Sequence, residues 1–146
     1  MSLSTQSLKI VVITAGVEQY GLPIEHVASI ERVLDITPMP EMPSDVLGII
    51  HLRGNVIPII DFGQLIGKGK TELTDQTRIV ILQNEANFLG LLTEAATDVI
   101  DIEADSIQSP GSFRSREDSL IKGVSKQDLH LVIVLNCPVI FSNRNL

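Results

Sequence analysis

Arg53 is the residue in this chain whose type and setting most clearly suggest chemistry, because it stands between two apolar runs, 47–52 and 56–62. Gly54 and Asn55 follow it and accept positive φ readily, so the segment predicts a β-hairpin with Arg53 at its tip. Neither run alternates apolar with polar residues, which predicts a hairpin covered on both faces. A guanidinium on such a support offers a planar fork of donors to a carboxylate or to backbone carbonyls. Arg53 is therefore a candidate binding residue, and a merely solvated turn residue is the alternative.

Other segments resemble phosphate-binding and calcium-binding motifs but do not have the residues at the spacing that these sites require. Five residues separate Gly63 from Gly69, where a phosphate-binding loop has four. Asp101, Glu103 and Asp105 have the first spacings of a calcium loop, but serines stand where that loop needs glycine and a closing glutamate. The histidines are scattered, and no nucleophile turn of the Gly-x-Ser-x-Gly type occurs. We therefore predict no catalytic, metal-binding or cofactor-binding residues and no enzyme.

Composition narrows the function classes. The net charge of −7 argues against nucleic-acid binding, which depends on cations that contact phosphate. One Tyr, four Phe and no Trp leave few surfaces for stacking bases. No apolar run approaches the roughly 18 residues that span a bilayer, so direct membrane insertion is not expected. A single cysteine, Cys137, suits a reducing cytosol.

Short apolar runs separated by turn residues predict about ten strands and little helix. Ten strands are comfortable as two five-stranded barrels, and two barrels packed side by side would explain strands that are apolar on both faces. We expect one domain, 1–146, made of two small barrel subdomains with a boundary near 67–77, the first strand exchanged between barrels being an alternative. A short helix is expected after Asn136. The stretch 103–119 has no periodicity and is expected to be functional or disordered.

The central motif also carries a family resemblance. Gly48-x-x-x-Leu52-Arg53-Gly54-x-Val56-Ile57-Pro58-x-x-Asp61 resembles the signature of the CheW family of chemotaxis adaptors. Weaker matches lie at 20–30, 36–40, 90–92, 98–100 and 121–124, so the resemblance runs from about residue 10 to residue 140. One departure is His51, where the family usually has asparagine.

The resemblance implies an all-β, CheW-like fold of two five-stranded barrels packed around a shared core. It also implies a non-enzymatic adaptor that couples chemoreceptors, the methyl-accepting chemotaxis proteins, to the histidine kinase CheA. One face would pair with the similarly folded regulatory domain of CheA, and a surface near the groove between the barrels would take the cytoplasmic tip of a receptor. The expected location is the cytoplasm, at the inner face of the membrane through receptor arrays. No cofactor is implied, and self-association is left open.

By position, the resemblance assigns receptor contact to Arg53 and coupling roles to Val27 and Gly48. For Val27 the alternative is an ordinary core residue, and for Gly48 it is backbone crowding in the hairpin. The partner-binding residues expected in full are Arg53, Val27, Gly48, Ile30, Val56 and Ala96. Ala96 lies where relatives often carry a larger apolar residue. Two other functions are weighed: an adaptor of a non-flagellar system such as pilus-based motility, and a small-molecule or purine-binding protein.

Overall fold

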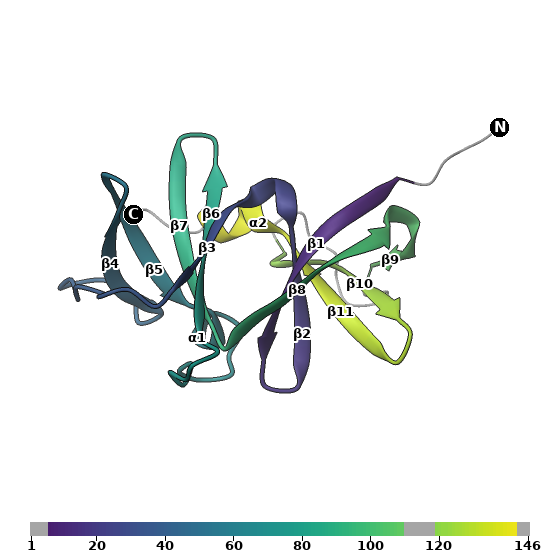
Figure 1. The fold of residues 1–146 in the computed structure, drawn as a ribbon, viewed down its shortest axis with the longest axis horizontal. Coiled ribbons are helices and arrows are strands. Elements are labelled where there is room, and N and C mark those ends of the chain that lie inside the picture. The colour runs from purple at the N-terminus through teal and green to yellow at the C-terminus, as the bar shows by residue number, and fades with distance from the viewer. Residues whose placement is uncertain (1–5, 110–118, 143–146) are drawn as a thin grey trace.

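Two curved β-sheets side by side make up the computed structural model, which describes residues 6–109 and 119–142 (Figure 1). The larger sheet has the strand order β8 (Ala95–Glu103), β1 (Ser7–Ala15), β2 (Glu18–Pro23), β11 (His130–Leu135), β10 (Ile121–Gln127) and β9 (Ile107–Gln108). The smaller has the order β3 (Val27–Arg32), β6 (Arg78–Asn84), β7 (Asn87–Thr93), β5 (Asn55–Asp61) and β4 (Val46–Leu52). Helix is confined to the 3-10 turns η1 (Ile24–His26) and η2 (Ala104–Ser106) and to α1 (Phe62–Leu65) and α2 (Cys137–Ser142). The predicted all-β class with a short helix after Asn136 is confirmed.

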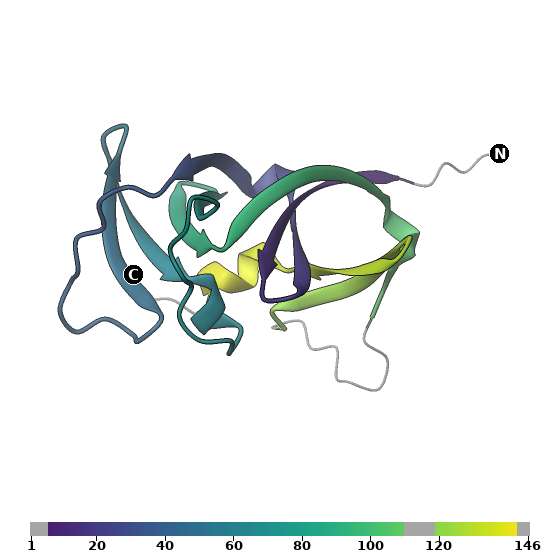
Figure 2. The same ribbon diagram turned by 60° about the horizontal axis from the view of Figure 1, so that its bottom comes forward.

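Each sheet curls until its ends meet, so the two barrels expected from sequence are present, the smaller built from a five-stranded sheet and the larger from a six-stranded one. In the smaller barrel, Thr37 follows β3 and exchanges two backbone hydrogen bonds of 2.8 and 2.9 Å with Ile49 of β4. In the larger barrel, β8 continues through η2 into β9, which pairs with β10 (Figure 2). The strand count exceeds ten because of β9, which lies in the stretch expected as a loop. Residues 110–118 of that stretch lie outside the described residues.

The two barrels repeat one topology. In each barrel the second strands of two hairpins pair in parallel. In the smaller barrel β5 of the β4–β5 hairpin pairs with β7 of β6–β7, and in the larger β11 of β10–β11 pairs with β2 of β1–β2. A bridging strand, β3 or β8, then borders the first strand of the β6–β7 or the β1–β2 hairpin. The tips of β4–β5 and β10–β11 are therefore equivalent positions, one at the mouth of each barrel.

The chain changes barrel at places other than the predicted boundary. It leaves the larger sheet at η1, and it returns at Glu94, between β7 and β8. Segment 67–77, with its polar and glycine-rich composition, connects β5 to β6, which both belong to the smaller sheet. The first strand pairs with β2 and with β8, so both N-terminal strands lie among the C-terminal ones. Composition marks a connector here, whereas pairing between distant strands decides which sheet each strand joins.

Apolar residues on both faces of a strand are explained by three cores. In β6, Val80 and Leu82 face a core shared by the two barrels, whereas Ile79 and Ile81 face the interior of the smaller barrel. A third, smaller core of Ile10, Ile102 and Val134 fills the larger barrel. Strands at the junction of the barrels therefore bury both faces. The β4–β5 hairpin, expected to be covered on both faces, is so only at its base, where Ile59 and Ile60 are buried. Near its tip Val56 is 57% exposed, so that part of the expectation is wrong.

Candidate functional site

A two-residue turn places Arg53 at the tip of the β4–β5 hairpin. Leu52 pairs with Asn55, and the two residues between them have positive φ, 49° at Arg53 and 82° at Gly54. A two-residue hairpin turn of the mirror-image type needs positive φ at both central positions, which matches the right-handed twist of the strands. The expectation of positive φ at Gly54 is confirmed, but the one at Asn55 is wrong, because Asn55 is already the first residue of β5.

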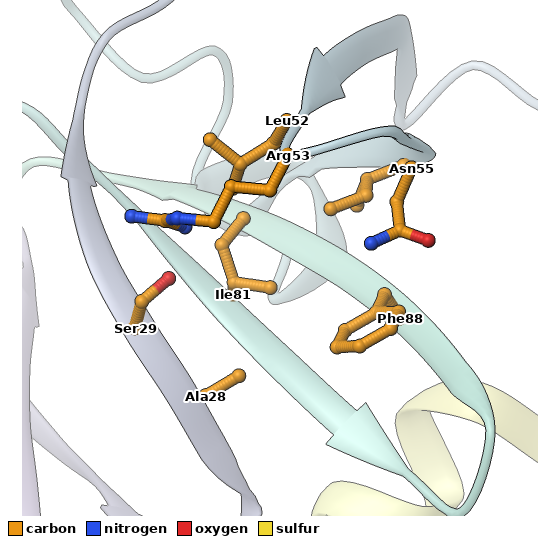
Figure 3. Close-up of a pocket in the computed structure, with 8 residues that line it drawn as sticks. Ala28, Ser29, Leu52, Arg53, Asn55, Ile81 and Phe88 are labelled. Carbon is orange, nitrogen blue, oxygen red and sulfur yellow. The ribbon is translucent and has the colours of Figure 1, made fainter.

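The Arg53 side chain reaches across the mouth of the smaller barrel to β3. Its Nη1 lies 3.1 Å from Oε2 of Glu31, and the two side chains are 68% and 17% exposed. Figure 3 shows the guanidinium extending toward the strand that carries Ser29. The ion pair therefore links strands from opposite ends of the sheet order. Exposed pairs of this kind contribute only about 0 to 1 kcal/mol, so Arg53 is held in place yet remains open to a partner.

A groove of about 370 Å³ lies beneath this contact (Figure 3). Its floor is apolar, formed by Ile57, Ile81 and Phe88, and its rim carries the polar groups of Ser29 and Arg53. The complete lining is Ala28, Ser29, Leu52, Arg53, Asn55, Ile57, Ile81 and Phe88. Such a groove can take an apolar side chain of a partner while a neighbouring carboxylate or carbonyl of that partner binds the guanidinium.

Glu31 is the residue that sequence reasoning missed at this site. A hydrogen bond from the Ser29 side chain, followed by the Arg53 guanidinium, lowers the pKa of the Glu31 carboxyl, although burial acts in the opposite direction. The sequence signal was the alternation in β3, where polar Ser29 and Glu31 are interleaved with apolar Ile30. Once Ile30 is assigned to one face, both polar residues must face the other.

Replacing Glu31 by Gln should remove a pH-dependent part of the stability. A lowered pKa means that the folded state favours the carboxylate, so the contribution is present above the ordinary value of 4.5 and is lost as the pH falls through the lowered pKa. We expect urea unfolding to show wild type more stable than Glu31→Gln at pH 7 by under about 1 kcal/mol, with the difference vanishing at low pH. Glu85→Gln, in the exposed β6–β7 turn, is the control. A wild-type to Glu31→Gln difference that is constant with pH would contradict the contribution of the ionised pair.

The mouth of the larger barrel is the counterpart of this groove but has a different charge. Asp128, with φ of 48°, occupies the turn equivalent to that of Arg53. A hollow of about 260 Å³ there is lined by Asp98 and His130 as well as by Asp128, over a floor that includes Val12 and Val132. At equivalent turn positions, the mouth of the smaller barrel therefore carries the basic Arg53 and the mouth of the larger barrel carries the acidic Asp128.

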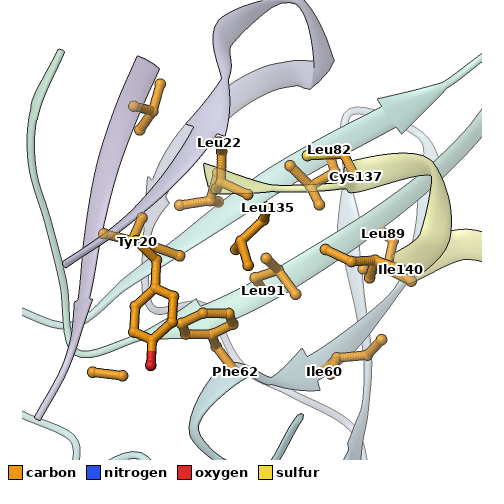
Figure 4. Packing of buried hydrophobic residues seen from close by; sticks show 14 of the residues in the cluster. Tyr20, Leu22, Ile60, Phe62, Leu82, Leu89, Leu91, Leu135, Cys137 and Ile140 are labelled. Atoms are coloured by element: carbon orange, nitrogen blue, oxygen red, sulfur yellow. The ribbon is translucent and has the colours of Figure 1, made fainter. Parts of the chain in front are cut away.

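Val27, Ile30 and Ala96 lie on a different face, beside the core shared by the barrels. Figure 4 shows the packing of buried side chains in that core. Val27 and Ala96 are half-buried and pack against this core, which supports the core alternative for Val27. Ile30 pairs with Val80 of the shared core and is 43% exposed. On β8, Val99 pairs with core residue Val11 and is 48% exposed. We call this border, formed by Val27, Ile30, Ala96 and Val99, the seam.

Gly48 and Val56 are the two remaining predicted partner-binding residues, and their surroundings differ. A Cβ on Gly48 would lie 2.1 Å from the backbone oxygen of Thr37, and its φ is 149°. Gly48 therefore allows the chain after β3 to close the barrel, and crowding is the reading that the geometry supports. Val56 is 57% exposed and pairs with exposed His51 on the outer face of the hairpin. Five of the six predicted residues thus fall on three surfaces, and Gly48 is buried inside the barrel.

The segment that resembles a phosphate loop is organised around buried Asp61. Its carboxylate accepts hydrogen bonds from the backbone N–H groups of Gly63 at 2.9 Å and Thr71 at 3.0 Å, and from the Thr71 hydroxyl at 2.6 Å. Asp61 thereby caps α1. Lys68 of the same loop pairs with Glu18 of β2, which ties the loop to the larger barrel.

Several features bear on other classes of function. Across residues 6–109 and 119–142, no group of three or more His, Cys, Asp or Glu is arranged to hold a metal ion. The helices in those ranges are too short or too polar to cross a membrane. Burial raises the pKa of the Cys137 thiol to about 12, the nearby Glu25 adding to the effect, so this cysteine is a core residue without thiolate character at neutral pH.

Proteins of known family resemble this chain in both sequence and fold. The family model of the CheW-like domain matches residues 9–145. Chemotaxis protein CheW of Treponema pallidum is 30% identical over 151 residues, covering 100% of this chain and 89% of that relative. Chemotaxis protein CheW of Rhizobium meliloti is 29% identical, covering 97% and 92%. The crystal structure of scaffolding protein TtCheW from Thermoanaerobacter tengcongensis matches with a TM-score of 0.81 and 33% identity, over 91% of this chain and 86% of that one. The chain therefore belongs to the CheW-like family of non-enzymatic chemotaxis scaffolding proteins.

Proposed function

We propose that this chain couples chemoreceptors to the histidine kinase CheA by docking each on its own surface of a rigid two-barrel body. The receptor tip lies along β3, and the regulatory domain of CheA binds the outer face of the β4–β5 hairpin. The assembly is cytoplasmic and is held at the inner face of the membrane by the receptors. Contacts of this transient kind typically bury under about 1,200 Å². Many weak contacts acting together would then build an array.

The observation that carries the receptor surface is the alternation along β3. This strand lies at the end of its sheet order, with Ile30 on the seam side and Glu31 on the side of the barrel mouth. A helical hairpin lying along β3 would meet Ile30 and Val27 on one side and the Arg53–Glu31 pair on the other. Apolar contact would supply affinity and the guanidinium would supply orientation, which is how anchor residues usually divide the work.

The kinase surface is supported by the exposed cross-strand pair of Val56 and His51. Both residues point away from the interior of the smaller barrel, since their neighbour Ile57 points into it. A domain of similar fold can present its own hairpin to this face. Because β3 and the outer hairpin face are different surfaces, both partners can bind at once, which is the requirement for coupling.

The test is a pair of variants that should separate the two partners. Ile30→Asp should weaken binding of a purified receptor cytoplasmic fragment by about 2 kcal/mol, roughly thirtyfold in Kd, while leaving CheA binding unchanged. Val56→Asp should do the reverse. Arg53→Ala should weaken receptor binding by about 2 kcal/mol with folding intact, since Arg53 is an exposed anchor. Titration calorimetry with each partner measures all three.

Val17→Asp is the matched control, because Val17 is an exposed valine at the β1–β2 turn of the larger barrel, 94% exposed. It adds the same charge at a site outside both proposed surfaces and should leave both affinities unchanged. Equal loss of both partners with Ile30→Asp would show that the surfaces are not separate. Wild-type receptor affinity in both Ile30→Asp and Arg53→Ala would remove β3 as the receptor surface.

A further inference from the structure

Two arginines face each other across neighbouring strands at one end of the smaller barrel. Arg32 of β3 pairs directly with Arg78 of β6. Like charges directly opposite on adjacent strands destabilise a sheet. Such a pair of arginines is unexpected in a chain that has 18 acidic residues and only 11 basic ones. The three ion pairs in residues 6–109 and 119–142 all lie elsewhere, so neither guanidinium is neutralised by a salt bridge there.

The two arginines line one hollow of about 300 Å³, together with Val33, Thr74, Asp75 and Thr77. Nη1 of Arg78 donates to the backbone oxygens of Asp75 at 2.9 Å and Thr77 at 2.8 Å, which fixes this guanidinium. The Nε and Nη2 groups of Arg78 can still donate hydrogen bonds to a ligand, and so can all the N–H groups of the exposed Arg32 guanidinium. Asp75 contributes one negative charge to the lining, which leaves the hollow with an excess of one positive charge.

The hollow continues the seam. Ile30 pairs with Val80 and Arg32 pairs with Arg78, so Ile30 and Arg32 lie on the same face of β3. A partner segment that lies on this face would contact Ile30 first and, two residues further along β3, the guanidinium groups of Arg32 and Arg78. The chemistry that matches this order is an apolar side chain followed by an oxyanion, because guanidinium forks pair best with carboxylate or phosphate oxygens.

We propose that Arg32 and Arg78 form an oxyanion site that binds a carboxylate side chain of the protein docked along the seam. This inference rests on the proposed docking of a receptor tip along β3, and it adds the chemical group that the tip must carry. A helix with an apolar residue and an acidic residue three or four positions apart presents both groups on one side. A free anion such as phosphate offers the same chemistry from another source.

The experiment measures the affinity of the receptor cytoplasmic fragment for wild type, Arg32→Gln and Arg32→Lys by calorimetry at low and high salt. At low salt, Arg32→Gln should weaken binding about five- to tenfold and should flatten its dependence on salt. Arg32→Lys, which keeps the charge without the fork, should lie between wild type and Arg32→Gln. Lys9→Gln is the matched control, since it removes one exposed positive charge from β1 of the other barrel and should leave the affinity within about twofold.

The outcomes separate this inference from the proposed function. Wild-type affinity for Arg32→Gln together with weakened binding for Ile30→Asp would overturn the oxyanion site and leave the docking surface standing. Wild-type affinity for both variants would overturn the docking surface itself. Inorganic phosphate provides the last arm, followed through the side-chain NMR signals of both arginines. Saturable binding of phosphate, with receptor affinity unchanged in Arg32→Gln, would assign the site to a free anion and overturn the partner carboxylate.

Discussion

Gly48→Ala is expected to lower the free energy of unfolding by about 4 kcal/mol, because it combines a strained positive φ with a backbone collision. The added Cβ would meet the Thr37 oxygen at 2.1 Å and the Thr37 carbonyl carbon at 2.7 Å, and neither atom can rotate away as a side chain could. The collision also falls on the Thr37–Ile49 bridge that closes the smaller barrel. Urea unfolding measures the loss, and hydrogen exchange at the amides of Thr37 and Ile49 should show the bridge opening.

Gly54→Ala separates the two causes. Gly54 also has positive φ, 82°, but a Cβ there has no atom within 4 Å. It should therefore cost only the conformational strain, about 1 kcal/mol. Equal losses for the two variants would show that the approach of Thr37 contributes nothing, and barrel closure would then not be the reason for a glycine at position 48.

Asp61→Ala should lower the free energy of unfolding by about 3 kcal/mol, because it removes a helix cap and leaves buried N–H groups without an acceptor. Asp61 is 2% exposed, and its carboxylate holds Gly63 at one end of the following loop and Thr71 at the other. The loop carries Lys68, whose contact with Glu18 joins the two barrels. The variant should therefore also weaken the tie between the barrels. Calorimetric unfolding should show the lowered stability, and NMR shifts at Glu18 should report the lost tie.

Thr71→Val is the matched control for Asp61. It removes one hydroxyl donor, 2.6 Å from the carboxylate, and leaves the backbone donors in place. The expected cost is about 1 kcal/mol, the usual value of one hydrogen bond. If Asp61→Ala costs no more than Thr71→Val, the carboxylate is not the centre of the loop. The aspartate of the family motif would then need another explanation.

The contact between Arg53 and Glu31 changes how the central motif is understood. The sequence predicts a hairpin tip that offers its guanidinium to a carboxylate or to backbone carbonyls, and the structure places a carboxylate of the same chain, Glu31 of β3, beside it. A carboxylate of a partner must compete with Glu31, or must bind the face of the guanidinium that Glu31 leaves open. Because the Arg53 side chain is 68% exposed, a partner can reach the guanidinium without burying the existing pair first. The contact orients Arg53 without burying it.

What the sequence determined by itself was local: the hairpin that carries Arg53, the short strands with little helix between them, and the C-terminal helix. These depend on side-chain alternation and on turn residues, which act within a few positions. Even there, Gly54 and Asn55 are the residues expected to take positive φ, whereas the turn consists of Arg53 and Gly54, because the pairing of Leu52 with Asn55 decides which two residues form it.

The tertiary structure alone decided how the segments combine. It placed β1 and β2 with the C-terminal strands, made Gly48 a packing residue, and divided Ile30 from Arg53 although both are expected as partner-binding residues. It also joined Arg53 to Glu31 and Arg32 to Arg78, pairs separated by 22 and 46 positions in the chain. The physical reason is that strand pairing depends on which distant backbone edges meet, and no local pattern in this chain records that choice.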